Sequence, residues 1–194
     1  MAVKNNITGI ILAGGKSSRM GSDKGFIKLN DKRFVLYSIE ALKPLVSEIL
    51  IVSDNENYDT FGYKRIEDII KNSGPVAGIY SGLKASKTEY NLILSCDIPL
   101  IKTHILNKLI DAIDNTSEVT QIESNGKSMP LIALYKKSIA PTFKNALAND
   151  ERRLRTVLKS LKTKTIILDA SEHNSTKNVN TPNELKTIEN AHNG

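Results

Sequence analysis

The stretch from residue 7 to residue 24 constrains the fold more than any other part of this chain. Its first half, ITGIILA, is short, apolar and rich in β-branched residues, which predicts a buried strand. Gly14 and Gly15 end that strand, and the loop behind them carries Arg19 and Lys24. Backbone N–H groups of a glycine loop can approach an anion closely, and basic side chains offset its charge. The pattern favours a phosphate-binding loop, the alternative being a surface loop with scattered charge.

Composition narrows the partners that this chain can have. The 194 residues carry a formal net charge of +6, which favours anionic partners such as nucleotides. The sequence has no long block of like charges and no basic patch with interleaved aromatics, so nucleic-acid binding is not expected. No apolar run approaches the roughly 18 residues that cross a bilayer, so no membrane partner is expected. We expect one domain over residues 1–194, acting as a monomer.

The cysteine and histidine residues do not indicate a catalytic thiol or a metal site. Cys96 is the only cysteine, which excludes an internal disulfide and a thiolate cluster for zinc and suits the cytoplasm. We interpret it as a packing residue rather than a nucleophile, because no histidine partner is evident. His104, His173 and His192 are too far apart in the sequence to suggest a local metal cluster.

Strand and helix patterns alternate through the first half of the chain. Further buried strands are expected at 48–53, 63–66 and 90–95. Helical spacing of apolar residues predicts helices from 35 to about 46, over 75–83 and over 105–113. Pro44 must end or kink the first of these helices. This alternation is the signature of a parallel sheet with right-handed crossovers.

The second half is less regular. Asn125-Gly126 is a strong hairpin signal, and it predicts that strands at 118–123 and 128–135 pair with each other. Pro130 should limit one of them to a sheet edge or a late start. Helices at 138–147, 154–161 and 183–191 and a strand at 165–168 complete the expected elements. The fold class is therefore α/β, with a mostly parallel central sheet and a small β-hairpin excursion.

Several of the predicted strands end in glycine or polar residues. In open parallel sheets, ligands bind beyond the carboxyl ends of the strands, so Gly14-Gly15, Ser53, Asp68 and Asp97 could meet in one crevice. Asp97 directly follows an apolar strand and lies two residues before Pro99. A lone carboxylate beside a phosphate loop is a suitable hard ligand for Mg²⁺. The alternative is a turn or N-cap aspartate.

Two common phosphate motifs do not fit the first loop. Gly15 and Gly21 are six residues apart and no lysine follows Gly21, so the loop lacks the G-x-x-x-x-G-K-[ST] pattern. It also lacks G-x-G-x-x-G. Neither a P-loop ATPase nor a dinucleotide-binding Rossmann domain is therefore the first choice.

The motifs do resemble those of one known group. LAGGKSSRMGSDK at 12–24 is similar to the signature loop of nucleotidyltransferases with a glycosyltransferase-A-like fold, and the chain resembles the molybdenum cofactor guanylyltransferase family within that group. The supporting matches are GPVAGI at 74–79, CDIP at 96–99, MPLIALY at 129–135, ERR at 151–153 and NVNTPNEL at 178–185. Many nucleotidyltransferases share the first motif, whereas its combination with GPVAG and NVNTP is far more specific.

The resemblance implies a fold and a reaction. The fold would be a three-layer, Rossmann-like nucleotidyltransferase fold, with a nucleotide-binding half at 1–115 and an acceptor half at 116–194. The terminal phosphate of molybdopterin, with or without molybdenum, would attack the α-phosphate of GTP with Mg²⁺ present. Pyrophosphate would leave and a guanine dinucleotide cofactor would form. Proteins that deliver or receive the cofactor would be transient partners.

The resemblance also implies roles for single residues. Those that would bind the nucleotide are Leu12, Ala13, Gly14, Gly15, Lys24, Asp68, Gly78 and Asp97. Catalytic roles, offsetting phosphate charge or holding the metal, would belong to Arg19, Lys24 and Asp97, with Asp97 as the Mg²⁺ ligand. The pterin side would comprise Asn178, Asn180, Arg152 and Arg153. Ser53 joins the nucleotide-binding set from its strand-end position alone, because the family often has asparagine there and serine lacks the paired amide edge.

Three alternatives remain open. The first is a cytidylyltransferase of the same fold acting on molybdopterin or on a sugar or isoprenoid phosphate. Gly14 argues against a cytidylyltransferase, because the space that a glycine leaves at that position would admit a purine, which is larger than cytosine. The second is a non-catalytic nucleotide-binding module, against which the intact set of Arg19, Lys24 and Asp97 argues. The third, general nucleic-acid binding, rests only on the net charge.

Overall fold

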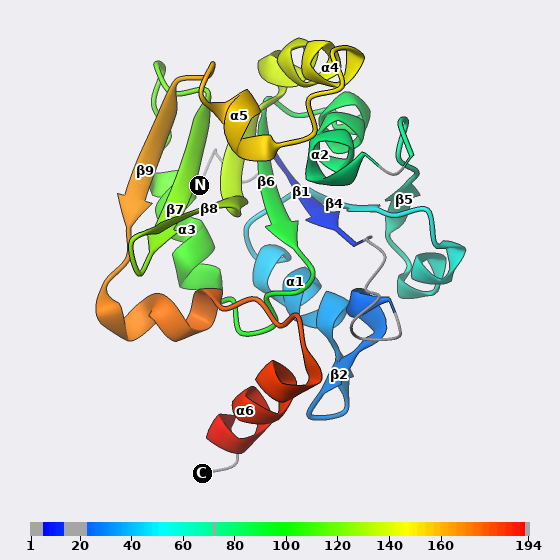
Figure 1. The fold of residues 1–194 in the computed structure, drawn as a ribbon, viewed down its shortest axis with the longest axis vertical. Coiled ribbons are helices and arrows are strands. Elements are labelled where there is room, and N and C mark those ends of the chain that lie inside the picture. The colour runs from blue at the N-terminus through cyan, green and yellow to red at the C-terminus, as the bar shows by residue number, and fades with distance from the viewer. Residues whose placement is uncertain (1–5, 14–22, 72, 193–194) are drawn as a thin grey trace.

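A seven-stranded sheet forms the centre of the computed structural model, which describes residues 6–13, 23–71 and 73–192 (Figure 1). Its strands are β1 (Ile7–Leu12), β4 (Glu48–Val52), β5 (Lys64–Ile66), β6 (Tyr90–Ser95), β7 (Val119–Ser124), β8 (Lys127–Lys136) and β9 (Thr163–Ile167). They lie in the order β5-β4-β1-β6-β8-β7-β9. Among the described strands of this sheet, β8 alone runs antiparallel to its neighbours. The predicted mostly parallel sheet is therefore confirmed.

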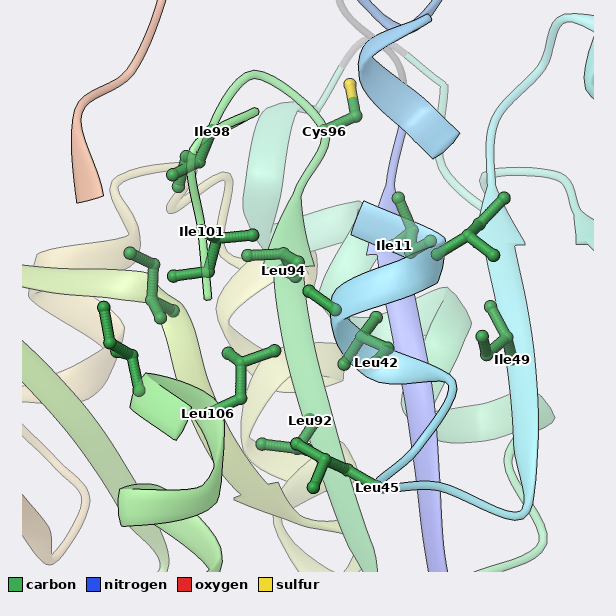
Figure 2. Packing of buried hydrophobic residues seen from close by; sticks show 14 of the residues in the cluster. Ile11, Leu42, Leu45, Ile49, Leu92, Leu94, Cys96, Ile98, Ile101 and Leu106 are labelled. Carbon is green, nitrogen blue, oxygen red and sulfur yellow. The ribbon is translucent and has the colours of Figure 1, made fainter. Parts of the chain in front are cut away.

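Helices cover both faces of the sheet and give three layers (Figure 1). One face packs against α1 (Phe34–Leu42) and α3 (Thr103–Asp111), and the other against α2 (Gly74–Ala85), α4 (Ala140–Ala148) and α5 (Leu154–Leu158). Side chains of a strand alternate between its faces, so Ile11 belongs to the first core and Ile10 to the second. Figure 2 shows the first core, where Leu42 packs beside the strands that carry Ile11 and Leu94.

The remaining elements lie around the sheet. A two-stranded hairpin, β2 (Lys28–Leu29) and β3 (Lys32–Arg33), turns through Asn30 and Asp31, which both have positive φ. The short 3-10 helices are η2 (Lys24–Phe26), η3 (Glu56–Phe61), η4 (Lys137–Ile139) and η5 (Ala170–Thr176), and the last element is α6 (Pro182–His192). No helix among the described residues is long and apolar enough to cross a bilayer.

The hairpin of β7 and β8 forms as predicted across Asn125-Gly126, where both residues have positive φ. The prediction for Pro130 is wrong, because β8 lies between β6 and β7 and already begins at Lys127. Gln121 pairs with Ala133 whereas Ile122 pairs with Met129, so a bulge on β8 contains the proline. A residue without an N–H group is tolerated inside a sheet at such a bulge, because the regular ladder of hydrogen bonds is interrupted there.

The C-terminal segment returns to the sheet at the end of β6. The backbone N–H of Val179 donates to the carbonyl of Asp97 at 2.8 Å. Val179 and Ile188 are buried in a small apolar cluster with Leu29 and Phe34, and this cluster seats α6 beside the β2–β3 hairpin (Figure 1). The fold thereby brings residues 178–180 next to the strand end that carries Asp97.

Candidate functional site

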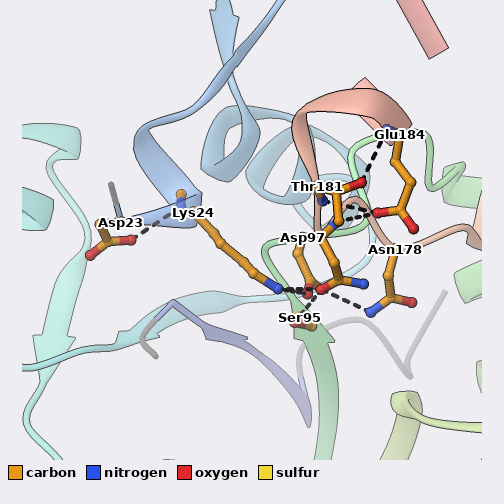
Figure 3. A network of polar contacts seen from close by, with 9 residues as sticks. Asp23, Lys24, Ser95, Asp97, Asn178, Thr181 and Glu184 are labelled. Atoms are coloured by element: carbon orange, nitrogen blue, oxygen red, sulfur yellow. Dashed lines mark hydrogen bonds and ion pairs between the residues drawn. The ribbon is translucent and has the colours of Figure 1, made fainter. Parts of the chain in front are cut away.

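Asp97 is the centre of a polar cluster at the carboxyl end of β6 (Figure 3). Its side chain is nearly buried, and both of its carboxylate oxygens accept hydrogen bonds. Oδ1 accepts from Ser95 Oγ at 2.6 Å and from Asn178 Nδ2 at 3.1 Å, and Oδ2 accepts from Lys24 Nζ at 2.8 Å. The carboxylate is therefore held in one orientation and paired with a cation.

Lys24 joins three distant parts of the chain. Its ammonium donates to Asp97 Oδ2 and, at 2.5 Å, to Asn180 Oδ1. Four of the residues singled out in the sequence, Lys24, Asp97, Asn178 and Asn180, thus lie together as one cluster. A cation beside a fixed carboxylate, where strands of a parallel sheet end, can bind a phosphorylated ligand and an accompanying metal ion.

The sequence around Asn180 explains how that residue is held. Glu184 Oε2 accepts hydrogen bonds from the backbone N–H groups of Asn180 at 2.6 Å and of Thr181 at 3.0 Å. Thr181 Oγ1 accepts from the N–H of Glu184 in return, which is the reciprocal arrangement of a capping box at the start of α6. The segment NVNTPNEL therefore both begins a helix and presents two amides to Asp97 and Lys24.

A second group of candidate residues lies at the ends of β1, β4 and β5. Ser53 is buried, its N–H donates to the carbonyl of Ile66 and its Oγ accepts from the N–H of Asn55 at 3.1 Å. A Cβ added to Gly78 in α2 would lie 3.2 Å from Leu12 Cδ2 and 3.7 Å from Asp68 Oδ1, so these three residues approach one another closely.

Asp68 has an unusual environment within this group. Its Oδ1 is buried and has no hydrogen-bond partner in the part of the chain that the structure describes. Burial raises the pKa of its carboxyl from 3.8 to about 6, and the nearby carboxylate of Asp54 adds to the rise. A buried acceptor without a donor points to a place where a ligand can supply one.

Other predicted residues lie apart from the cluster or outside the described chain. The main chain of Ala13 continues the pairing of β1, because its N–H donates to the carbonyl of Val52. Arg152 pairs with Asp150, and Arg153 pairs with Glu151, in the connection between α4 and α5. The described part of the chain shows no hydrogen bond or ion pair that links these two arginines to Asp97 or to residues 178–180, so their pterin-side role stays a prediction. Gly14, Gly15 and Arg19 lie outside the described residues.

The donor set fits a magnesium ion that binds together with phosphates. Among the described residues there is no group of three or more acidic, histidine or cysteine side chains that could hold a metal by itself. Mg²⁺ commonly uses one or two carboxylates and completes its shell with water and substrate phosphates. Asp97 provides one carboxylate of that kind. Cys96 lies beside it and is buried, and this burial raises the pKa of its thiol far above the usual range. The thiol therefore stays protonated, which agrees with a packing role.

Several residues of the cluster cannot be identified from local sequence patterns. The T-P-N-E run at 181–184 is a recognisable capping-box signal, and it indicates how the backbone of Asn180 is held. Ser95 is the last residue of an expected strand, and nothing in the sequence indicates its hydrogen bond to Asp97. Asp23 lies in the loop motif at 12–24, but nothing in the sequence indicates its contact with Tyr58, which is 35 residues away.

Three comparisons with known proteins agree with one another. The MobA-like NTP transferase domain matches residues 9–165. A probable molybdenum cofactor guanylyltransferase from Flavobacterium johnsoniae is 38% identical over 182 residues, which cover 94% of this chain and 96% of that protein. A molybdenum cofactor guanylyltransferase from Shewanella loihica is 32% identical, with 95% and 96% covered.

The third comparison concerns a solved structure. Molybdopterin-guanine dinucleotide biosynthesis protein A from Archaeoglobus fulgidus has a TM-score of 0.82 with this chain at 22% identity, covering 96% of this chain and 98% of that one. At this identity the likeness shows the fold alone, and it confirms the predicted fold class.

Proposed function

The chain belongs to the MobA-like NTP transferase family, and from that premise we propose that it transfers a guanylyl group from GTP to the terminal phosphate of molybdopterin. Pyrophosphate leaves, and a guanine dinucleotide cofactor forms. The observation that carries the proposal is the cluster of Lys24, Asp97, Asn178 and Asn180. It joins the end of the glycine loop to the NVNTP segment, so a nucleotide side and an acceptor side meet at one lysine.

The protein's own groups suit this chemistry without a strong base. The attacking phosphate of the acceptor is already an anion, so catalysis can rest on alignment and on neutralising charge. The Lys24 ammonium lies between Asp97 Oδ2 and Asn180 Oδ1, where it can contact the triphosphate and the approaching acceptor. Ser95 and Asn178 fix the orientation of the Asp97 carboxylate. Arg19 is proposed as a second cation for the phosphates.

Nucleotidyltransferases usually depend on a divalent metal, and we propose Mg²⁺ at Asp97. The single carboxylate beside a phosphate-binding cation fits such an ion. When bound, the metal would neutralise charge on the phosphates of the nucleotide. Ser95 and Asn178 would keep the carboxylate in the orientation that receives it.

The ends of β1, β4 and β5 are proposed as the rest of the nucleotide site. Leu12, Gly78 and Asp68 approach one another there. The buried Oδ1 of Asp68 is available to accept a hydrogen bond from the nucleotide. Ser53, Ala13 and the glycines at 14 and 15 remain part of the proposed site on the grounds given by the sequence, with Gly14 as the position that leaves room for a purine.

The acceptor side and the partners remain proposals of the same kind. Asn178 and Asn180 are proposed to contact molybdopterin, with Arg152 and Arg153 as further candidates. All four would belong to an acceptor half at 116–194 of a single domain. We propose that the protein acts as a monomer in the cytoplasm, where GTP is available, and exchanges the cofactor with delivery proteins and molybdoenzymes.

One experiment tests the reaction directly. The protein is incubated with GTP, Mg²⁺ and molybdopterin, and the products are detected by mass spectrometry. We expect the mass of the guanine dinucleotide and a stoichiometric release of pyrophosphate. A parallel incubation with CTP tests the choice of base, because a higher kcat/KM for CTP would show a cytidylyltransferase. Binding of GTP without any transfer would favour the nucleotide-binding module instead.

A further inference from the structure

Asp23 lies directly before Lys24, and its carboxylate is held by donors from three positions in the chain. Oδ1 accepts from the N–H of Gly25 at 3.1 Å and from Tyr58 Oη at 2.5 Å, and Oδ2 accepts from Asn55 Nδ2 at 3.0 Å. Figure 3 shows that the two neighbouring side chains point in opposite directions, with Lys24 directed toward Asp97 and Asp23 away from it. The cluster around Asp97 does not explain these contacts.

Tyr58 is built firmly into this arrangement. It is fully buried in η3, and its ring packs against Phe26 with a centroid distance of 4.7 Å. A Cβ on Gly25 would overlap the Tyr58 hydroxyl, so only glycine at this position allows η2 to lie this close to Tyr58. Burial raises the pKa of the Tyr58 hydroxyl, which therefore stays protonated and able to donate.

Asn55 connects the same carboxylate to the end of β4. Its N–H donates to Ser53 Oγ, and its own Oδ1 accepts from the N–H of Asn57 at the start of η3. The amide is thereby fixed with its Nδ2 toward Asp23. Hydrogen bonds therefore connect Ser53, which lies in the proposed nucleotide site, to the residue next to Lys24.

We propose that Asp23, Asn55 and Tyr58 form an anchor network that positions Lys24 for the triphosphate of the nucleotide. A lysine side chain has four rotatable bonds, so the place of its ammonium depends on where its backbone begins. Three donors on the Asp23 carboxylate fix that backbone and offset a negative charge that would otherwise repel phosphate. Asp23, Asn55 and Tyr58 are positioning residues in this view, and the inference rests on the proposed function because its ligand is GTP.

The first test removes a single hydroxyl. Tyr58→Phe keeps the buried ring and loses only the donor to Asp23. Tyr135→Phe is the matched control, since Tyr135 is also fully buried and its hydroxyl donates to the carbonyl of Pro130. Binding of Mg²⁺-GTP is measured by calorimetry, which needs no molybdopterin. We expect affinity to fall about five- to tenfold in Tyr58→Phe and to stay unchanged in Tyr135→Phe.

The second test exchanges the two polar partners. Asp23→Asn alone sets two amide NH₂ groups against each other, and we expect a similar loss of GTP affinity. Adding Asn55→Asp restores the pair, because the amide at position 23 can donate to the carboxylate at position 55. That carboxylate can also accept from the N–H of Asn57, so each hydrogen bond of the original network again has a donor and an acceptor. We expect the double variant to recover most of the GTP affinity.

The outcomes separate this inference from the proposed function. Unchanged affinity in Tyr58→Phe, in a protein whose wild type binds GTP, overturns the anchor network. So does an equal loss in the Tyr135→Phe control, because that result would mean a general loss of stability. A failed rescue combined with an altered Mg²⁺ requirement would make Asp23 a metal ligand and would also overturn it. If wild type binds GTP but does not transfer it to molybdopterin, the proposed function fails while the calorimetric result still decides the network.

Discussion

Asp97 and Asp68 occupy equivalent places in the fold, yet their carboxylates have opposite surroundings. Each follows the carboxyl end of a parallel strand, which is where ligands of open α/β folds bind. The oxygens of Asp97 accept from Ser95, Asn178 and Lys24. The Oδ1 of Asp68 is buried with no donor among the described residues. The Asp97 carboxylate is oriented by its donors and paired with a cation, whereas the Asp68 carboxylate keeps a hydrogen-bond site that a ligand can fill.

The position of each strand in the sheet explains the difference. β6 lies near the middle, and the chain returns to its end through Val179, whose N–H donates to the carbonyl of Asp97. That return supplies Asn178 and Asn180. β5 is an edge strand, so within the described part of the chain no later strand of the sheet lies alongside Asp68 on its outer side. The protein can thus supply the hydrogen-bond donors for a carboxylate at the end of a central strand. At the end of an edge strand, more of the donors must come from the ligand.

The largest expected effect comes from removing the partnered carboxylate. Asp97→Ala takes away the proposed metal ligand and the acceptor for Lys24, and we expect turnover with GTP and Mg²⁺ to fall about 10³-fold. Far-ultraviolet circular dichroism should still show a folded protein, because the strand and its core are unchanged. Asp111→Asn, on the surface of α3, serves as the control and should keep full activity. Near-wild-type turnover in Asp97→Ala would show that the metal assignment is wrong.

A smaller effect on function is expected from replacing the unpartnered carboxylate of Asp68, and this replacement should make the protein more stable. Because the folded pKa of Asp68 is raised from 3.8 to about 6, the folded protein binds this proton more tightly than the unfolded chain. Stability is therefore lost as pH rises through that window, and the deficit is fully present above it. Asp68→Asn removes the buried charge, and we expect a gain of about 1 kcal/mol at pH 7–8, a figure already reduced for solvent screening of a partly exposed group.

Denaturant unfolding of both proteins between pH 4 and pH 8 checks this expectation. The two stability curves should converge near pH 4 and separate as pH rises. GTP affinity of Asp68→Asn should fall several-fold, because the nucleotide loses a charged acceptor. Parallel curves over the whole range would contradict the raised pKa. A stabilised variant with weakened binding would mark Asp68 as a residue kept for function at a cost in stability.

The comparison also shows what the sequence could predict. Strands, helices and the hairpin follow local patterns, and these placed Asp97 and Asp68 correctly at strand ends. The resemblance of NVNTPNEL to a family motif added Asn178 and Asn180, which no local pattern could have set beside Lys24. The Pro130 bulge and the burial of Asp68 Oδ1 depend on which strands become neighbours. Such facts are tertiary, so periodicity and turn signals do not contain them.

The smallest effect is expected from the segment that gives Asp97 its partners. Glu184 caps α6 and holds the backbone of Asn180, so Glu184→Ala should loosen that residue without touching the nucleotide. We expect the KM for molybdopterin to rise about two- to threefold, in line with the loss of one helix cap, while GTP affinity stays the same. Glu184→Gln should recover the wild-type value, because its amide oxygen can still accept from the same N–H groups.

Glu189→Ala tests whether that effect belongs to the cap or to helix charge in general. Glu189 lies in the same helix but beyond its first turn, so its removal should leave both KM values unchanged. Equal effects of the two alanine variants would mean that α6 acts only through its overall stability. A selective effect of Glu184→Ala on molybdopterin would instead show that the protein completes the Asp97 end of the sheet from its acceptor side, as the contrast with Asp68 requires.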